Sequence, residues 1–244
     1  MRRRYFGWLC GGLLSAALTT PGWAAADSGA IWHAVLVAGD YAEPVFDNAV
    51  TMFQRRLTAF GVPSDKIHRF SARPNPNDPG LAPARAERIL ERIASLPARP
   101  GERCLVFITS HGERGKGAWL AYGEEFLPPA ALARALDGGC ARVPTVVIVS
   151  ACYSGGFVNG PMAAPNRIIL TAARPDRPSF GCQVDRTYAV FDECLLGVLP
   201  RSATWWAVAA DAGDCVRHRE HELRALPSQP QKYFGAAVRK LSVR

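Results

Sequence analysis

The sequence predicts an α/β fold with a mainly parallel central sheet that helices cover on both faces. Short runs of β-branched and apolar residues alternate with longer stretches in which apolar residues recur at helical spacing. In the clearest run, 145–149, all five residues are β-branched, as expected for a strand buried on both faces of a parallel sheet. Because strands alternate with helices, we expect right-handed crossovers and one sheet whose neighbouring parallel strands end at a common edge.

The elements follow one another along the chain without an internal repeat or a second domain. Strands are expected at 31–38, 64–70, 104–109, 145–149 and 167–171, with a hairpin at 119–126. Helices are expected at 44–60, 84–95, 130–136, 188–196, 202–225 and 232–241. Gly61 ends the first helix, and the segment 71–83, which is rich in proline, asparagine and glycine, is expected to be a loop.

The first 26 residues have the pattern of a secretory signal peptide. Three arginines at 2–4 precede an apolar core at 5–18 and small residues at 24–26, so we expect cleavage ahead of Asp27. A membrane anchor is disfavoured by the short core and the polar residues that follow it, whereas a twin-arginine signal stays open. The sequence thus predicts an exported protein, periplasmic or secreted, with one domain at 27–244 and no stable membrane insertion after cleavage.

Composition excludes some classes of partner. The mature chain of 218 residues is long enough for one well-buried domain. Loss of the three signal-peptide arginines lowers the net charge from +8 to +5, and the remaining positive charge is spread along the chain. No basic tract or nucleic-acid motif accompanies it, so we expect no nucleic-acid partner.

Six cysteines remain after residue 26, and in an exported protein most of them should pair. One or two disulfides are therefore expected, with a connectivity that the spacing leaves open. If Cys152 must stay a free thiol, at least one further cysteine is unpaired. No Cys/His spacing typical of zinc is present, so no metal and no cofactor are expected.

Cys152 stands where the 145–149 strand ends, just before the turn-forming residues 154–156. Open α/β sheets bind ligands at this edge of the sheet. A lone cysteine here is more often a buried structural residue. His111 changes that interpretation, because it follows the 104–109 strand and would meet Cys152 if the two strands are neighbours.

A thiol and an imidazole on one sheet edge are the components of nucleophilic catalysis. The imidazole makes the thiolate accessible near neutral pH. Cys152 would attack a carbonyl carbon, and His111 would assist deprotonation and then protonate the leaving amine. The backbone N–H of Gly112, which no side chain obstructs, and that of Cys152 would donate to the developing oxyanion.

The strand ending Thr-Ser-His-Gly and the later strand ending Ser-Ala-Cys-Tyr-Ser-Gly-Gly together resemble the legumain-type cysteine peptidases, relatives of the caspases and of the GPI-anchor transamidase. The resemblance covers roughly residues 31–194. It implies a caspase-like three-layer α/β/α sandwich with a His–Cys dyad. By this likeness His111 is the base, Cys152 the nucleophile and Gly112 part of the oxyanion hole.

Other positions differ from the family pattern. The family has an asparagine after the first strand that orients the histidine; Asp40 lies at or near that place and can accept the same hydrogen bond. Legumains select asparagine through an Arg-His pair that opens the first helix and a glutamate two residues before the cysteine. Phe46-Asp47 and Ser150 occupy those places here, so strict selection of asparagine is not implied.

The resemblance also implies substrate-binding residues. The segments 171–175 and 179–182 resemble the wall of the family's substrate pocket, which makes Ser179 a candidate beside Ser150. Asp192 matches the family's pocket aspartate. Because the aspartate is kept and the arginine is lost, we hypothesise that the pocket takes a polar or basic side chain.

The sequence therefore predicts a cysteine endopeptidase that hydrolyses a peptide or protein substrate through a thioester acyl-enzyme. A transamidase that uses the same dyad and a non-catalytic binding protein of the same fold are the alternatives, and the oligomeric state stays open. The histidines at 218 and 221 lack metal-site order and are interpreted as a solvated helix face. Ser154 lacks the Gly-x-Ser-x-Gly frame and is interpreted as a turn residue.

Overall fold

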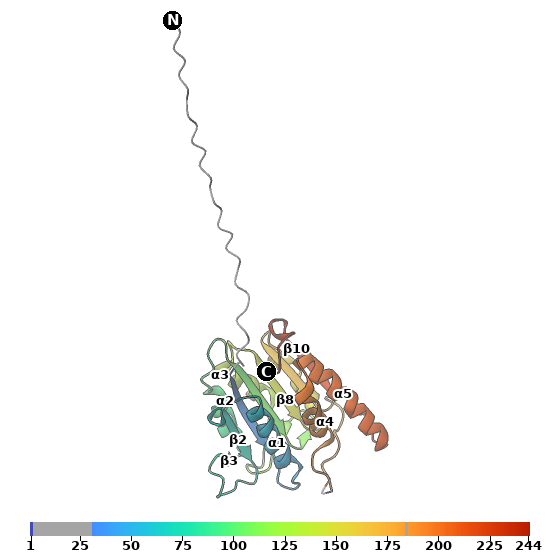
Figure 1. Ribbon diagram of the computed structural model, residues 1–244. Helices are drawn as coiled ribbons and strands as arrows, with labels where there is room; N and C mark the ends of the chain where they lie inside the picture. The colour runs from blue at the N-terminus through green and yellow to red at the C-terminus, as the bar shows by residue number, and fades with distance from the viewer. Residues whose placement is uncertain (2–30, 184) are drawn as a thin grey trace.

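Seven strands form the central sheet in the part of the chain that the computed structural model describes, which is Met1, residues 31–183 and residues 185–244. Residues 2–26 of the expected signal peptide lie outside it. In chain order the strands are β1 Trp32–Ala38, β2 Ile67–Ser71, β3 Leu81–Pro83, β4 Arg103–Thr109, β8 Thr145–Ser150, β9 Arg167–Thr171 and β10 Gln231–Phe234. Across the sheet their order is β10-β9-β8-β4-β1-β2-β3 (Figure 1), and β10 alone among them runs antiparallel to its neighbour.

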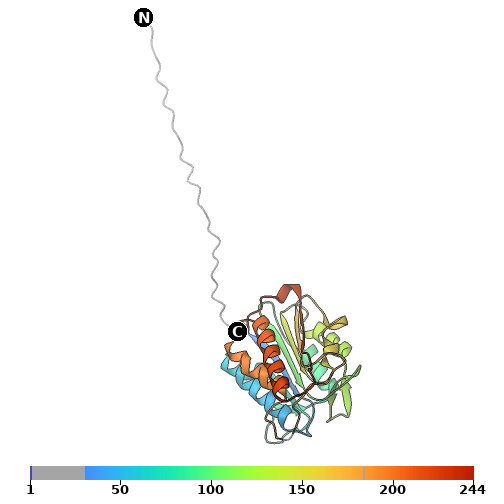
Figure 2. The ribbon, with the colours of Figure 1, turned by 90° about the vertical axis from the view of Figure 1, so that its right-hand side faces the viewer.

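Helices cover both faces of this sheet. They are α1 Val45–Ala59, α2 Ala86–Ala94, α3 Pro129–Gly139, α4 Val190–Val198 and α5 Trp205–Glu222, with 3₁₀ turns η1 Ser64–Lys66, η2 Ser154–Phe157, η3 Gly160–Met162, η4 Leu199–Arg201 and η5 Ala236–Val238. α1, α4 and α5 lie on one face and α2 and α3 on the other, as Figure 2 shows in a view along the layers. Successive side chains of β1 alternate between the two cores: Leu36 enters one and Val37 the other. The predicted three-layer α/β/α architecture is confirmed.

A small antiparallel sheet lies directly after His111. Its strands are β5 Gly112–Glu113, β6 Gly117–Leu120 and β7 Glu125–Leu127, so the predicted hairpin at 119–126 is part of a three-stranded unit. The N–H of Trp119 donates to the carbonyl of His111 over 2.9 Å. This bond fixes the backbone of the histidine against a folded hairpin instead of leaving it in an open loop.

The helix predicted at 232–241 is wrong. Lys232, Tyr233 and Phe234 instead pair with β9 as strand β10, and the short turn η5 follows. The strand forms because of a tertiary contact: without β10, β9 would present an unpaired row of N–H and C=O groups at the edge of the sheet. The loop predicted at 71–83 likewise contains β3, which pairs with β2.

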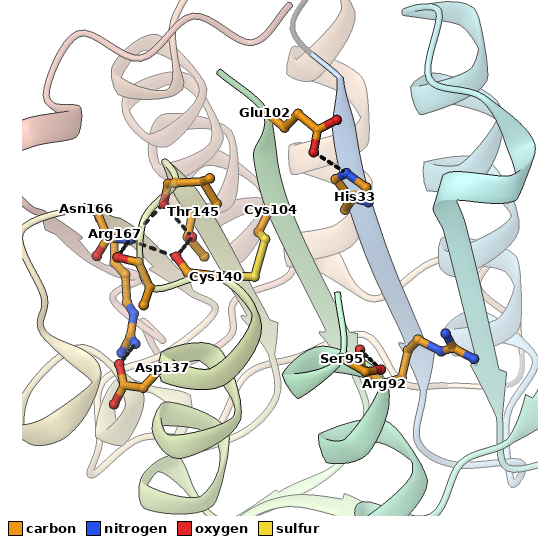
Figure 3. Close-up of a disulfide and its surroundings, with 12 residues drawn as sticks. His33, Arg92, Ser95, Glu102, Cys104, Asp137, Cys140, Thr145, Asn166 and Arg167 are labelled. Atoms are coloured by element: carbon orange, nitrogen blue, oxygen red, sulfur yellow. Dashed lines mark hydrogen bonds and ion pairs between the residues drawn. A yellow bond between two sulfur atoms is a disulfide. The ribbon is translucent and has the colours of Figure 1, made fainter. Parts of the chain in front are cut away.

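Two disulfides tie helices to their neighbours among the described residues. Cys104 at the start of β4 bonds to Cys140 at the end of α3 (Figure 3), and Cys194 on α4 bonds to Cys215 on α5. Around the first disulfide, Asn166 donates to the carbonyls of Cys140, Ala141 and Val143, and Arg167 pairs with Asp137 at 2.5 Å. These contacts hold the amino-terminal end of the sheet, which is the end opposite the carboxyl ends of its parallel strands.

The described residues hold neither a membrane-spanning helix nor a cluster of metal ligands. None of the described helices combines the length and the hydropathy that a bilayer span requires. Within 31–183 and 185–244 no group of three or more His, Cys, Asp or Glu residues could hold a metal ion. His218 and Glu222 form an exposed ion pair on α5, in agreement with the interpretation as a solvated helix face.

Candidate active site

The ends of three neighbouring strands define the candidate site. Ala38 of β1 pairs with Thr109 of β4, and Thr109 pairs with Ser150 of β8. His111 and Cys152 each follow their strand by the same number of residues, so the parallel register brings them to one edge, as the sequence predicted. The pairing continues past β4, because the N–H of Ser110 donates to the carbonyl of Ser150 over 3.0 Å.

Gly112 lies against the backbone of Cys152. A Cβ atom at position 112 would stand 2.3 Å from the carbonyl oxygen of Cys152 and 3.1 Å from the Cβ of Ala151. Carbon and oxygen atoms cannot approach that closely, so any side chain would force the two segments apart. Glycine is therefore required for the backbones after β4 and β8 to touch.

The chain turns sharply immediately after Cys152. Tyr153 has φ 58° and ψ 13°, a left-handed conformation that is uncommon for a residue with a side chain. Its N–H donates to the carbonyl of Arg177 over 2.8 Å, and Arg114 lies over its ring at 5.8 Å. Backbone strain of this kind persists only where the surroundings impose it, and it gathers at functional sites.

The thiol of Cys152 is partly exposed and faces Ser179. The N–H of Ser179 lies 3.4 Å from Sγ, the carbonyl oxygen lies 3.6 Å away and the hydroxyl lies 3.8 Å away. Ser179, predicted to bind substrate, is thus brought directly beside the predicted nucleophile.

The ring of His111 is held by an aromatic contact that the sequence did not indicate. Phe46, the first-turn residue of α1, meets the imidazole edge-to-face with the ring centroids 5.3 Å apart. Asp40 instead accepts from the N–H of Ala42 over 2.7 Å, and within the described residues no hydrogen bond joins it to His111. The predicted bond between the Asp40 carboxylate and the His111 imidazole is thus not formed. The one clue to Phe46 in the sequence is its place in the first turn of the helix that follows β1.

Ser150 and Asp192 lie behind the strand ends. Their exposed fractions are 3% and 0%, so their side chains face the interior and not the solvent. The hydroxyl of Thr109 donates to Oδ2 of Asp192 over 2.6 Å, whereas Oδ1 has no hydrogen-bond partner. Burial raises the pKa of Asp192 to about 7, and the hydroxyls of Thr109 and Ser150 oppose part of that rise.

A second free thiol, Cys182, lies close to this group. Burial, followed by the negative charges of Cys152, Asp192, Glu43 and Asp40, raises the pKa of the Cys182 thiol to about 12. Oε2 of Glu43 is buried and has no hydrogen-bond partner. The side of the site that faces Cys182 is therefore acidic.

A pocket of about 410 Å³ opens on the other side of the site. It is lined by His111, Gly112, Glu113, Trp119 and Phe126, and the rings of Trp119 and Phe126 pack at 5.0 Å. A larger cavity of about 850 Å³ lies between α5 and the segment 225–232, and none of the predicted site residues lines it. The pocket beside His111 is the one that can receive part of a substrate at the dyad.

The fold and the strand-end geometry define a caspase-like α/β protein. The chain superimposes on caspase-1 from Spodoptera frugiperda with a TM-score of 0.58 and 13% identity, over 84% of this chain and 86% of that one. The model of the peptidase C13 family, the legumain family, matches residues 89–202, which include both His111 and Cys152. The predicted resemblance to legumain-type, caspase-fold cysteine peptidases is confirmed. No curated protein matches the chain in sequence.

Proposed function

We propose that the protein is a cysteine endopeptidase in which Cys152 is the nucleophile and His111 the general base. The observation that carries the proposal is the pairing of β4 with β8, which delivers a histidine and a free cysteine to one edge of the sheet. The contact between Gly112 and the carbonyl of Cys152 keeps the two segments side by side. The match to the peptidase C13 family over the same residues supports this reading.

Acylation follows from these groups. His111 takes the thiol proton, and the sulfur of Cys152 attacks the carbonyl carbon of the scissile peptide bond. The tetrahedral intermediate carries a negative oxygen, to which the N–H groups of Gly112 and Cys152 donate. His111 then gives its proton to the leaving amine, and a thioester on Cys152 remains.

Hydrolysis completes the cycle. His111 takes a proton from water, the resulting hydroxide attacks the thioester carbonyl, and the sulfur leaves as the protonated thiol. An amine in place of water would give a new amide bond, which is the transamidase alternative with the same dyad. Product analysis by mass spectrometry with an added amine separates the two, because only a transamidase yields the amine conjugate as its main product.

The surroundings support a direction for the bound peptide. His111 must reach the leaving amine, so the residue after the scissile bond belongs on the His111 side, where Trp119 and Phe126 form the walls of the 410 Å³ pocket. The residue before the bond then lies towards Ser179 and the acidic side. The charges of Glu43 and Asp40 favour a polar or cationic side chain there.

The free state of Cys152 favours an enzyme over a non-catalytic binding protein whose dyad is locked in a disulfide. Four other cysteines pair with one another, as suits an oxidising compartment. With the signal-peptide pattern at 1–26, this supports a domain at 27–244 that is exported to the periplasm or secreted and acts there on peptide or protein substrates.

Labelling by an acyloxymethyl-ketone peptide tests the proposal. We expect covalent labelling of Cys152, none in Cys152→Ala and a strong reduction in His111→Ala, because the thiolate needs the imidazole. His33→Gln is the matched control, since His33 is buried at the opposite edge of the sheet and bonds Glu102. The proposal fails if labelling of Cys152 is absent or is the same in His111→Ala as in the unchanged protein.

A further inference from the structure

A buried carboxyl group touches the end of one strand of the site and lies beside the end of the other. Asp192, in the first turn of α4, accepts a hydrogen bond from the hydroxyl of Thr109 over 2.6 Å and is completely buried. The hydroxyl of Ser150 lies close enough to lower the pKa of the same carboxyl. Thr109 and Ser150 are themselves register partners on β4 and β8. Asp192 is thus bonded to the end of β4, which is itself paired with the end of β8.

These two strand ends carry the dyad. One residue separates Thr109 from His111, and one separates Ser150 from Cys152. The intervening Ser110 is also fixed, because its N–H bonds the carbonyl of Ser150 and its hydroxyl bonds the carbonyl of Trp119. Few backbone torsions therefore lie between the buried carboxyl and either reacting group. A shift of Thr109 relative to Ser150 passes directly to His111 and Cys152.

The helix that carries Asp192 is clamped from outside. Glu193 pairs with Arg186 at 2.5 Å and with Arg219 of α5 at 2.7 Å. Cys194 bonds covalently to Cys215 of α5. The two residues that follow Asp192 are thus anchored to other parts of the chain, which holds the first turn of α4 in place and directs its carboxyl at the sheet.

The ionised form of the carboxyl is the one that both hydroxyls stabilise. Burial opposes that form and raises the pKa to about 7, so Asp192 titrates in the range where enzymes are assayed. The other titratable groups on this side of the site are Cys152 and Cys182 together with Asp40 and Glu43 of the segment after β1. Asp47 of α1 is engaged by Ser71 instead.

We propose that Asp192 is a positioning residue: through its hydrogen bond to Thr109, the register partner of Ser150, it fixes the end of β4 against β8 and so sets the placement of His111 relative to Cys152. The proposal rests on the proposed function of the dyad. It assigns to Asp192 a contact with the strands, whereas the sequence resemblance implied a contact with substrate. The bond to Thr109 does not involve the substrate, so the predicted effects are the same for every peptide.

Substitutions that separate the charge of Asp192 from its hydrogen bond to Thr109 test the positioning role. Asp192→Ala removes both, and we expect kcat/KM to fall about 10- to 100-fold, since small misplacements of reacting groups cost this much. Asp192→Asn keeps an acceptor for Thr109 without the charge, so its loss should be roughly threefold to tenfold smaller. Thr109→Val should resemble Asp192→Ala, and the double variant should lose little more, because both changes cut the same bond.

The pH profile adds a readout that a purely structural role would not move. In the unchanged protein kcat/KM should rise as pH passes through about 7, the pKa of Asp192. Thr109→Val removes a donor to the carboxylate, so the rise should move to higher pH, and in Asp192→Asn this component should vanish. Glu220→Gln is the matched control: Glu220 is another buried carboxyl, which bonds Ser228 away from the dyad, and its profile should not change.

Failure of the positioning role of Asp192 can be told apart from failure of the proposed peptidase function. Urea unfolding first shows which variants are folded; if Asp192→Ala is not, Thr109→Val carries the test. If kcat/KM falls only for peptides with one kind of residue before the cut, the positioning role is overturned and Asp192 contacts substrate instead. If the unchanged protein cleaves nothing, the proposed function has failed, and the rate at which iodoacetamide alkylates Cys152 is compared instead. Equal rates in folded Thr109→Val and unchanged protein would then overturn the positioning role.

Discussion

Gly112 and Cys152 meet through their backbones: a Cβ atom on Gly112 would stand 2.3 Å from the carbonyl oxygen of Cys152. The contact exists because β4 and β8 are paired to their last residues and the bond from Ser110 to Ser150 extends the pairing beyond them. It places the proposed oxyanion donor beside the proposed nucleophile. The same contact makes position 112 intolerant of any side chain.

Gly112→Ala should therefore reduce kcat/KM by about 100-fold or more, since the methyl group must displace the Cys152 carbonyl. Hydrolysis of a fluorogenic peptide measures the effect. Gly156→Ala is the control from the turn that follows Cys152, because a methyl group there meets nothing within 4 Å, and it should retain most of the activity. Full activity in Gly112→Ala would contradict the proposed geometry.

The two free thiols should differ in reactivity. Burial raises the pKa of Cys182 to about 12, so almost none of it is thiolate near neutral pH. Iodoacetamide at pH 7.5, followed by peptide mass spectrometry, should modify Cys152 and leave Cys182 intact until urea is added. Equal modification of both residues in the folded protein would show that Cys182 is not closed off by its surroundings.

Stability should depend on pH through Asp192. Its ordinary pKa of 3.8 rises to about 7 on folding, so between these values the folded protein binds more protons than the unfolded chain. The free energy of unfolding therefore falls as pH rises through this window, by at most about 1.4 kcal/mol per pH unit from this group. Urea unfolding at pH 5, 6, 7 and 8 measures it. Asp192→Asn should lack this component; an unchanged slope in that variant would be evidence against the raised pKa.

Peptide selection should follow the acidic side of the site. Among peptides that vary at the residue before the cut, we expect lysine, arginine and polar residues to be preferred over apolar ones. Glu43→Gln should reduce the preference for cationic over neutral residues roughly tenfold, because one buried and unpaired carboxylate oxygen is lost. Glu87→Gln, an exposed acid on α2, should leave the preference unchanged. A preference for apolar residues would refute the assignment of an acidic subsite.

Local patterns were sufficient wherever a residue's role depends on its own segment. The β-branched run before Cys152 and the apolar run before His111 mark buried strands, and a residue that follows such a strand in a parallel sheet must lie at its carboxyl edge. The family match over residues 89–202 agrees with the motifs that ended those two runs.

Segments whose conformation depends on a distant partner were not predictable in this way. Residues 231–234 are a strand because β9 offers them an unpaired edge, and nothing in their own short pattern indicates it. Disulfide connectivity depends on which helices pack together, and spacing alone does not reveal that Cys194 meets Cys215. Asp40 and Phe46 show the same limit, since the loop after β1 decides which of them reaches His111.

The sequence by itself thus determined the α/β class, the edge of the sheet that carries chemistry and the two residues proposed to perform it. Those features depend on hydrophobic periodicity and on where each run stops, both of which are local. Only the tertiary structure decided that Asp192 is buried and bonded to Thr109 and that Phe46 contacts His111. Such contacts join residues far apart in the chain, and packing of α1 and α4 on the sheet brings them together.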